Sequence, residues 1–121
     1  MSAQNTQIQT GDIKDLQKNY KFGWFMGSFV DEETPFHSKD FELKLGTHPK
    51  GEVRESTSPA GNTQETLCII IEGAFKIVFH DDNREVIVDK PYQYFYFSPS
   101  APHTTTALEE SKLLTIRWPS L

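Results

Sequence analysis

From residue 22 onward, the chain is a succession of short segments that favour β-strands, each followed by residues that favour turns. Aromatic and β-branched residues gather in these segments, which suits a β core better than a helical one. Turn signals return at intervals of roughly 8 to 12 residues. This pattern predicts an all-β sandwich or barrel and argues against a fold of alternating strands and helices.

Eight or nine segments are expected to be strands, of which 52–56 is the weakest. They are residues 24–30 (interrupted by Gly27), 41–45, 52–56, 66–71, 74–79, 85–88, 92–97, 104–108 and 112–118. The alternation of apolar and polar residues over 41–45 predicts a half-buried strand. The continuous apolar run over 66–71 predicts a strand that is buried on both faces.

A polar tail and one short helix are expected before the strands. Residues 1–11 are rich in Gln and Thr, which is typical of a mobile tail. Asp12 is placed to cap a short helix in which Ile13, Leu16 and Tyr20 share one face. We therefore expect a tail and a short helix over 1–20, followed by a single β-barrel domain over 21–121.

Composition excludes several classes of partner. The 121 residues carry a formal net charge of −5, which argues against broad nucleic-acid binding, since that requires a basic face. No apolar run approaches the roughly 20 residues of a membrane span, and the polar N-terminus lacks the apolar core of a secretory signal. A cytoplasmic protein is expected. The single Cys68 lies in an apolar run and is expected to be a small buried hydrophobic side chain.

Two motifs resemble those of the cupin superfamily, whose members are small double-sheet jelly-roll barrels. Gly51 and Gly73 fall near the two glycines of the first cupin motif, and His103 follows a Pro-containing turn at the histidine position of the second. The resemblance covers roughly residues 41–119. It is closer still to short cupin-like proteins with Gly-x-His-x-x-Gly-Glu-x-Arg, here 46–54, and a final Arg-Trp-Pro-Ser, here 117–120. The implied fold is an all-β, cupin-like double-sheet jelly-roll barrel with a short N-terminal helix or tail.

The residues that would complete a cupin metal site differ in this sequence. The two remaining histidine positions of the family fall on Thr57 and Pro59, and the glutamate position falls on Thr66. Glu65 is one residue away, which in a strand turns its side chain to the opposite face. A catalytic metal usually has about three protein ligands. We therefore expect no cofactor, and a divalent metal only through a shifted ligand set of His103, His48 and Glu65.

Two arginines are candidates for holding an anion. Arg117 shares one face of its expected strand with Leu113 and Thr115, so it enters the barrel if those two residues face inward. A buried cation needs a partner, and a guanidinium can hold a carboxylate through two hydrogen bonds. Arg54 lies in a strand-like segment as well. For both arginines, a salt bridge to an acidic side chain is the simpler alternative.

Other polar side chains are candidates for the same pocket. His48 precedes a proline, so it is expected either in the pocket or in a surface loop. Tyr94 and Tyr96 alternate with Phe95 and Phe97, so one row is expected in the core and the other in a pocket wall or a dimer surface. The full set of pocket candidates is His103, Arg117, Tyr94, Tyr96, Arg54, His48 and Thr66.

The fold resemblance does not choose among functions, because cupins include isomerases, dioxygenases, decarboxylases and binding proteins. The leading hypothesis is a protein that binds a small polar or anionic molecule in the barrel without a catalytic metal. An enzyme is the first alternative, either metal-dependent through the shifted ligand set or an isomerase in which His103 and Tyr94 or Tyr96 act as base and acid. A structural dimerisation module is the second. By resemblance to cupins, a homodimer is expected.

Overall fold

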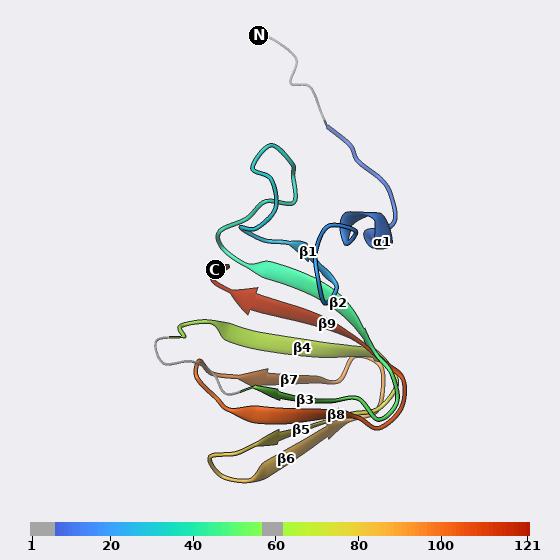
Figure 1. The fold of residues 1–121 in the computed structure, drawn as a ribbon, viewed down its shortest axis with the longest axis vertical. Coiled ribbons are helices and arrows are strands. Elements are labelled where there is room, and N and C mark those ends of the chain that lie inside the picture. The colour runs from blue at the N-terminus through green and yellow to red at the C-terminus, as the bar shows by residue number, and fades with distance from the viewer. Residues whose placement is uncertain (1–6, 57–61) are drawn as a thin grey trace.

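The computed structural model describes residues 7–56 and 62–121, and these residues form two antiparallel sheets (Figure 1). The elements are α1 (Ile13–Leu16), β1 (Trp24–Met26), β2 (Glu42–His48), β3 (Val53–Ser56), β4 (Glu65–Glu72), β5 (Phe75–Phe79), β6 (Arg84–Val88), β7 (Tyr94–Phe97), β8 (His103–Ala107) and β9 (Ser111–Trp118). No helix in the described part of the chain is long and apolar enough to cross a membrane.

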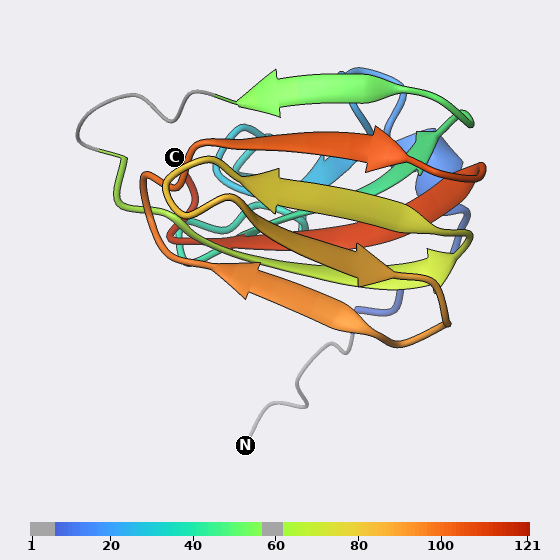
Figure 2. The same ribbon diagram turned by 90° about the horizontal axis from the view of Figure 1, so that it is seen from below.

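The two sheets stack as layers, as Figure 2 shows. One sheet has the strand order β1-β2-β9-β4-β7 and the other has the order β3-β8-β5-β6. The chain passes from one sheet to the other between β2 and β3, and again at each of the steps β3–β4, β4–β5, β6–β7, β7–β8 and β8–β9. This is the arrangement of a double-sheet jelly roll, so the fold class predicted from the sequence is confirmed.

The short helix α1 begins where its capping residue predicts. Asp12 adopts an extended backbone conformation, and its Oδ1 accepts a hydrogen bond from the Lys14 amide at 2.9 Å. Strand β1 is shorter than expected, because it ends at Met26 instead of continuing to residue 30. After that point the Gly27 amide donates to the Phe36 carbonyl at 3.1 Å, so the chain leaves the edge of the sheet.

Strand β2 alternates as predicted, and it is its polar face that points into the barrel. Glu42 and His48 are buried, and Lys44 lies between them on the same face. Leu43 and Leu45 occupy the outer face and are half-buried. Alternation in the sequence indicates the period of a strand but not which face meets the second sheet.

The expectation that this apolar strand, β4, is buried on both faces is wrong, because only one of its faces is buried. Thr66, Cys68 and Ile70 point between the sheets and are buried, whereas Ile71 on the outer face is 40% exposed. A two-layer fold covers only one face of each sheet, so the outward apolar residues of β4 receive less cover.

The apolar core fills one part of the space between the sheets. Ile70, Ile77 and Leu113 are its most deeply buried large side chains, and Phe75 and Phe95 pack beside them. Burying each such side chain stabilises the fold by about 1.5–3 kcal/mol. The rest of the space between the sheets is lined largely with polar side chains, and the candidate site lies there.

The turn between β4 and β5 requires a glycine. Gly73 has a φ of +101°, and a Cβ at this position would collide with the backbone carbonyl of Glu110. The neighbouring Ser111 is fully buried, and its hydroxyl accepts a hydrogen bond from the Ala74 amide at 3.2 Å. The turn is therefore packed tightly against the start of β9.

Gly73→Ala is expected to destabilise the protein by more than Gly51→Ala. Gly51 has a similar positive φ of +88°, but among the described residues no atom lies within 4 Å of an added Cβ. The backbone strain of about 1–2 kcal/mol is common to both variants, and the collision adds about 1–3 kcal/mol only at Gly73. Chemical denaturation measures both free energies of unfolding, and equal losses would contradict the role of the collision.

Candidate functional site

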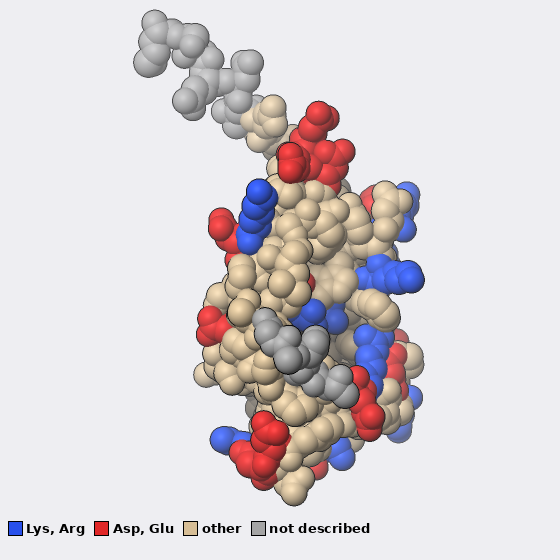
Figure 3. Space-filling model, turned by 60° about the vertical axis from the view of Figure 1, so that its left-hand side comes forward, with Lys and Arg blue, Asp and Glu red and all other residues tan. Residues whose placement is uncertain are grey.

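A cavity of about 390 Å³ lies between the two sheets, beside the apolar core. Lys44, Arg54 and Arg117 line it together with His48 and His103. Its other lining residues include hydroxyl side chains, from Ser56, Thr66, Thr105 and Thr115, and the edges of the apolar core, from Phe75, Ile77, Phe95, Phe97 and Leu113. Figure 3 shows basic side chains gathered around a recess on this side of the molecule.

Strand pairing explains why these side chains meet. In the five-stranded sheet Lys44 pairs across to Thr115, and Thr115 in turn pairs with Cys68. Arg117 lies two residues beyond Thr115 on the same face of β9, opposite Thr66 of β4. The sequence predicts that Arg117 enters the barrel if Leu113 and Thr115 face inward. Both of these residues are buried, and Arg117 lines the cavity.

The four-stranded sheet supplies the opposite wall of the cavity. Arg54 of β3 pairs with Thr105 of β8, and Ser56 pairs with His103. These four side chains lie on the inner face of their sheet, and all four line the cavity. Cationic and hydroxyl groups of both sheets therefore face one shared space.

Aromatic rings hold the three cations in place. The Nζ of Lys44 lies 5.1 Å from the centre of the Trp24 ring, and the Cζ of Arg117 lies 4.9 Å from the same ring. Arg54 lies 5.1 Å from the ring of Phe22 in the same way. A cation over an aromatic face is stabilised by about 0.5–2 kcal/mol, which offsets part of the cost of removing it from water.

The three cations differ in how closely a carboxylate approaches them. The Nε of Arg54 lies 3.0 Å from Oε1 of Glu52, whereas Nη1 of Arg117 is 3.9 Å from Oε2 of Glu42. Among the described residues, no carboxylate oxygen lies within 4.0 Å of Nζ of Lys44. Lys44 and Arg117 are thus the cations that are least neutralised by the protein.

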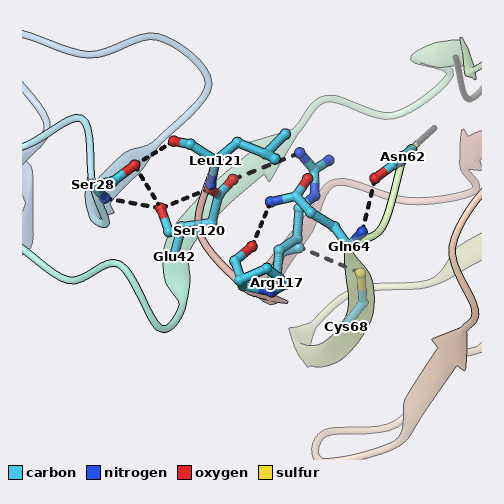
Figure 4. A network of polar contacts seen from close by, with 10 residues as sticks. Ser28, Glu42, Asn62, Gln64, Cys68, Arg117, Ser120 and Leu121 are labelled. Atoms are coloured by element: carbon cyan, nitrogen blue, oxygen red, sulfur yellow. Dashed lines mark hydrogen bonds and ion pairs between the residues drawn. The ribbon is translucent and has the colours of Figure 1, made fainter.

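Glu42 is turned toward the end of the chain, as Figure 4 shows. Its Oε1 accepts hydrogen bonds from the Ser120 hydroxyl and the Leu121 amide, both at 3.0 Å. The Ser120 hydroxyl also accepts a hydrogen bond from the Ser28 amide at 2.8 Å. The Arg-Trp-Pro-Ser sequence therefore has a structural role, because it places Arg117 in the cavity and Ser120 against Glu42.

The charge of Lys44 is opposed by its surroundings. Burial, and to a smaller extent the charge of the nearby Arg117, lowers its pKa to about 8. The side chain is therefore mostly protonated at pH 7 and loses its proton at mildly alkaline pH.

His48 is part of a hydrogen-bonded chain beside the cavity. Its Nδ1 lies 2.6 Å from Oε1 of Glu52, the same oxygen that pairs with Arg54. Burial lowers the pKa of His48 despite this carboxylate, so a neutral ring donates its Nδ1 proton to Glu52. His48 is only 7% exposed, so a position in a surface loop, the alternative left open by the sequence, is wrong.

His103 also lies in the cavity as a neutral side chain. Its Nδ1 lies 2.8 Å from the carbonyl oxygen of Ala101, and since a carbonyl only accepts, the ring donates from this nitrogen. Burial lowers the pKa of His103, and the charge of Arg117 acts in the same direction. The Nε2 of the neutral ring is therefore a hydrogen-bond acceptor.

Tyr94 and Tyr96 lie outside the cavity, so the proposed pairing of His103 with either tyrosine is wrong. In β7 the alternate residues Phe95 and Phe97 point inward, and this turns the two tyrosines to the outer face, where they are 66% and 46% exposed. The hydroxyl of Tyr96 donates to Oε1 of Glu65 at 2.7 Å.

The described side chains do not fit a resident metal ion. Within 7–56 and 62–121, no three His, Cys, Asp or Glu side chains gather as a metal site would require. Glu65 bonds to Tyr96 on the outer face, away from His48 and His103. The three cations that line the cavity would also repel a divalent ion. Thr57 and Pro59, at two ligand positions of the resemblance, lie outside the described residues.

The candidate set taken from the sequence omits Lys44 and Trp24. Five members of that set do line the cavity: His103, Arg117, Arg54, His48 and Thr66. The signal for Lys44 is nevertheless present, because Lys44 and His48 are four positions apart in one strand, and residues an even number of positions apart share a face. A pocket position for His48 therefore implies one for Lys44.

Comparison with known proteins bears on the fold. No protein-family model matches the sequence, and no curated protein does. The solved structure of KdgF from Halomonas sp. superposes with a TM-score of 0.60 at 17% identity, covering 70% of this chain and 74% of that one. A cupin superfamily protein from Desulfitobacterium hafniense superposes with a TM-score of 0.57 at 21% identity, covering 67% of this chain and 69% of that one. The EutQ protein of Clostridium difficile superposes with a TM-score of 0.55 at 11% identity. The match covers 67% of this chain but only 53% of the EutQ chain.

These similarities carry information about architecture alone, because the sequence identities are low. They agree with the motif resemblance and with the two antiparallel sheets of the structure. The chain has a cupin-like fold.

Proposed function

We propose that this protein binds a small organic anion in the cavity between its sheets, with Arg117 as the principal contact and Lys44 and Arg54 beside it. The observation that carries the proposal is the convergence of three cations on one cavity in a protein whose formal net charge is −5. Dispersed surface charge would not produce this arrangement. Pockets of this kind use a few convergent polar groups to orient a ligand.

Arg117 is the best placed of the three cations to hold a carboxylate. A guanidinium offers donors in a planar fork that matches the two oxygens of a carboxylate. The nearest carboxylate of the described residues, on Glu42, is 3.9 Å away and accepts shorter hydrogen bonds from Ser120 and Leu121. A half-buried cation without a close partner is costly, and an anionic ligand would remove that cost.

The rest of the cavity favours a ligand with a short apolar body. Phe75, Ile77 and Leu113 line its apolar side, and the hydroxyls of Thr66 and Thr105 line the polar side. A volume of about 390 Å³ falls within the range of small-molecule sites, which is roughly 300–1,000 Å³. The expected ligand is therefore a small carboxylic or phosphoric acid with a compact carbon skeleton.

Of the other hypotheses from the sequence, the structure favours self-association over an acid–base isomerase. An acid–base isomerase that uses His103 with Tyr94 or Tyr96 is not supported, because both tyrosines are on the outer face. The same exposed tyrosines lie on β7, an edge strand of the five-stranded sheet, which favours a role in self-association. A homodimer and a cytoplasmic location stay predictions.

Arg117→Gln is expected to weaken the binding of succinate, lactate or inorganic phosphate, used as probes, by about tenfold or more. The reason is the loss of a charge-assisted contact, which contributes about 1.5–3 kcal/mol. Isothermal titration calorimetry measures the affinities. Arg84→Gln is the matched control, because Arg84 is also a strand arginine but is exposed on β6. If none of the probes binds, or if both variants bind equally well, the proposal fails.

Anion affinity is also expected to fall as the pH rises above about 8. The pKa of Lys44 is lowered to about 8, so the positive charge is present below this pH and is lost above it. If the anion binds only the protonated form, the apparent dissociation constant at pH 9 rises about tenfold relative to pH 7. The charged or titratable groups that face Lys44 are Arg117, Arg54, Glu42, Cys68 and His48.

Lys44→Arg isolates this effect, because a guanidinium keeps its charge throughout the range. Its affinity is expected to stay constant between pH 7 and pH 9. The pKa of the His48 ring is lowered from its usual range and that of the Cys68 thiol is raised, both by burial, so neither group gains charge between these pH values. A wild-type affinity that does not change over this range would contradict the assigned role of Lys44.

A further inference from the structure

We propose that Lys44 forms a reversible imine with a small 2-oxo acid whose carboxylate is held by Arg117. This inference rests on the proposed anion-binding function and specifies the class of ligand. It adds a covalent step that anion binding alone does not require.

The geometry of two neighbouring strands carries the inference. Lys44 on β2 pairs directly with Thr115 on β9, and Arg117 is the next inward residue of β9. Diagonal neighbours of this kind have backbones about 7–8 Å apart, within reach of two long side chains. Both cationic groups lie about 5 Å from the centre of the Trp24 ring, so one aromatic platform fixes them. A 2-oxo acid carries its carboxylate and its carbonyl on adjacent carbons, which suits two such adjacent groups.

Lys44 differs from other lysines in its surroundings. Lys50, Lys76 and Lys112 pair with Glu109, Glu85 and Glu72 at 3.6, 3.7 and 3.1 Å. Within 7–56 and 62–121, Lys44 has no carboxylate oxygen within 4.0 Å of its amino group, and it lines a cavity instead. An unpaired amine in a half-buried, partly apolar site is the arrangement that favours attack on a carbonyl carbon.

The surroundings also make the amine available in its nucleophilic form. Burial and the charge of Arg117 lower the pKa of Lys44 to about 8, so about a tenth of the molecules carry a neutral amine at pH 7. For a lysine of ordinary pKa the fraction is smaller by roughly two orders of magnitude. The thiol of Cys68 is not a competing nucleophile, because burial raises its pKa.

The proposed step conserves atoms and electrons. The lone pair of the neutral Nζ forms a bond to the carbonyl carbon, and the carbonyl electron pair moves to its oxygen. The two protons of the amine are transferred to that oxygen, which leaves as water as the C=N bond forms. One amine and one 2-oxo acid thus give one imine and one water, without an oxidant or a reductant. The carboxylate stays ionised on Arg117 throughout.

Reductive trapping tests this step. The protein is incubated with pyruvate and sodium cyanoborohydride, which reduces an imine to a stable secondary amine, and peptide mass mapping locates the carboxyethyl group. Lys44 is expected to be modified at least about tenfold faster than half-buried Lys76 or exposed Lys112. Lys44→Arg is expected to lose this fast modification. If that variant does not fold, the map of the wild-type protein still decides between Lys44 and the surface lysines.

Arg117→Gln tests the role of the carboxylate. This variant is expected to slow trapping of pyruvate about tenfold more than trapping of acetone, which has no carboxylate and responds only to the loss of Arg117's effect on the pKa of Lys44. If Lys44 is modified no faster than Lys76, or if Arg117→Gln slows both reagents equally, the inference is overturned.

Lactate separates this inference from the proposed function, because it has the carboxylate of pyruvate but no carbonyl. Arg117-dependent binding of lactate without fast modification of Lys44 would overturn the imine and leave anion binding intact. Failure of both binding and trapping would overturn both.

Discussion

The pairing of β9 with β2 on one side and β4 on the other determines what occupies the space between the sheets. Ser111–Trp118 lies in the middle of the five-stranded sheet, and its register with both neighbours aligns their inward residues in rows. One row brings Leu113 to Ile70 and builds the apolar core, and the rows beyond it bring Thr115 and Arg117 beside Lys44 and Thr66. A shift of one residue would exchange these rows for the outer face.

The protein assembles a cationic site within an acidic chain by separating its charges in space. Glu52 is drawn to His48 and Arg54, and Glu42 to the hydroxyl and amide near the end of the chain. Carboxylates therefore border the cavity without filling it. Trp24 takes the place of a counter-ion for Lys44 and Arg117, because an aromatic face stabilises a cation without neutralising it.

Most of the strand segments along the chain were predictable, because turn residues and apolar runs set the length of each segment. The inward face of a strand was predictable only where one face is clearly apolar. In β2 and β7 both faces offer plausible core residues, so the inward positions of Lys44 and Phe95 depend on pairing with distant strands. The end of β1 at Met26 depends likewise on a contact with Phe36 that local propensity does not record.

The cluster of Lys44, Arg117 and Trp24 has a consequence for how this sequence responds to selection. Two like charges share one half-buried ring, and their repulsion lowers the stability of the folded protein. Proteins commonly retain such groups at the expense of stability because their function needs them. Variants selected in the laboratory for heat resistance alone are therefore expected to replace these two cations early, and the positions that change would outline the cationic cavity independently of any binding measurement.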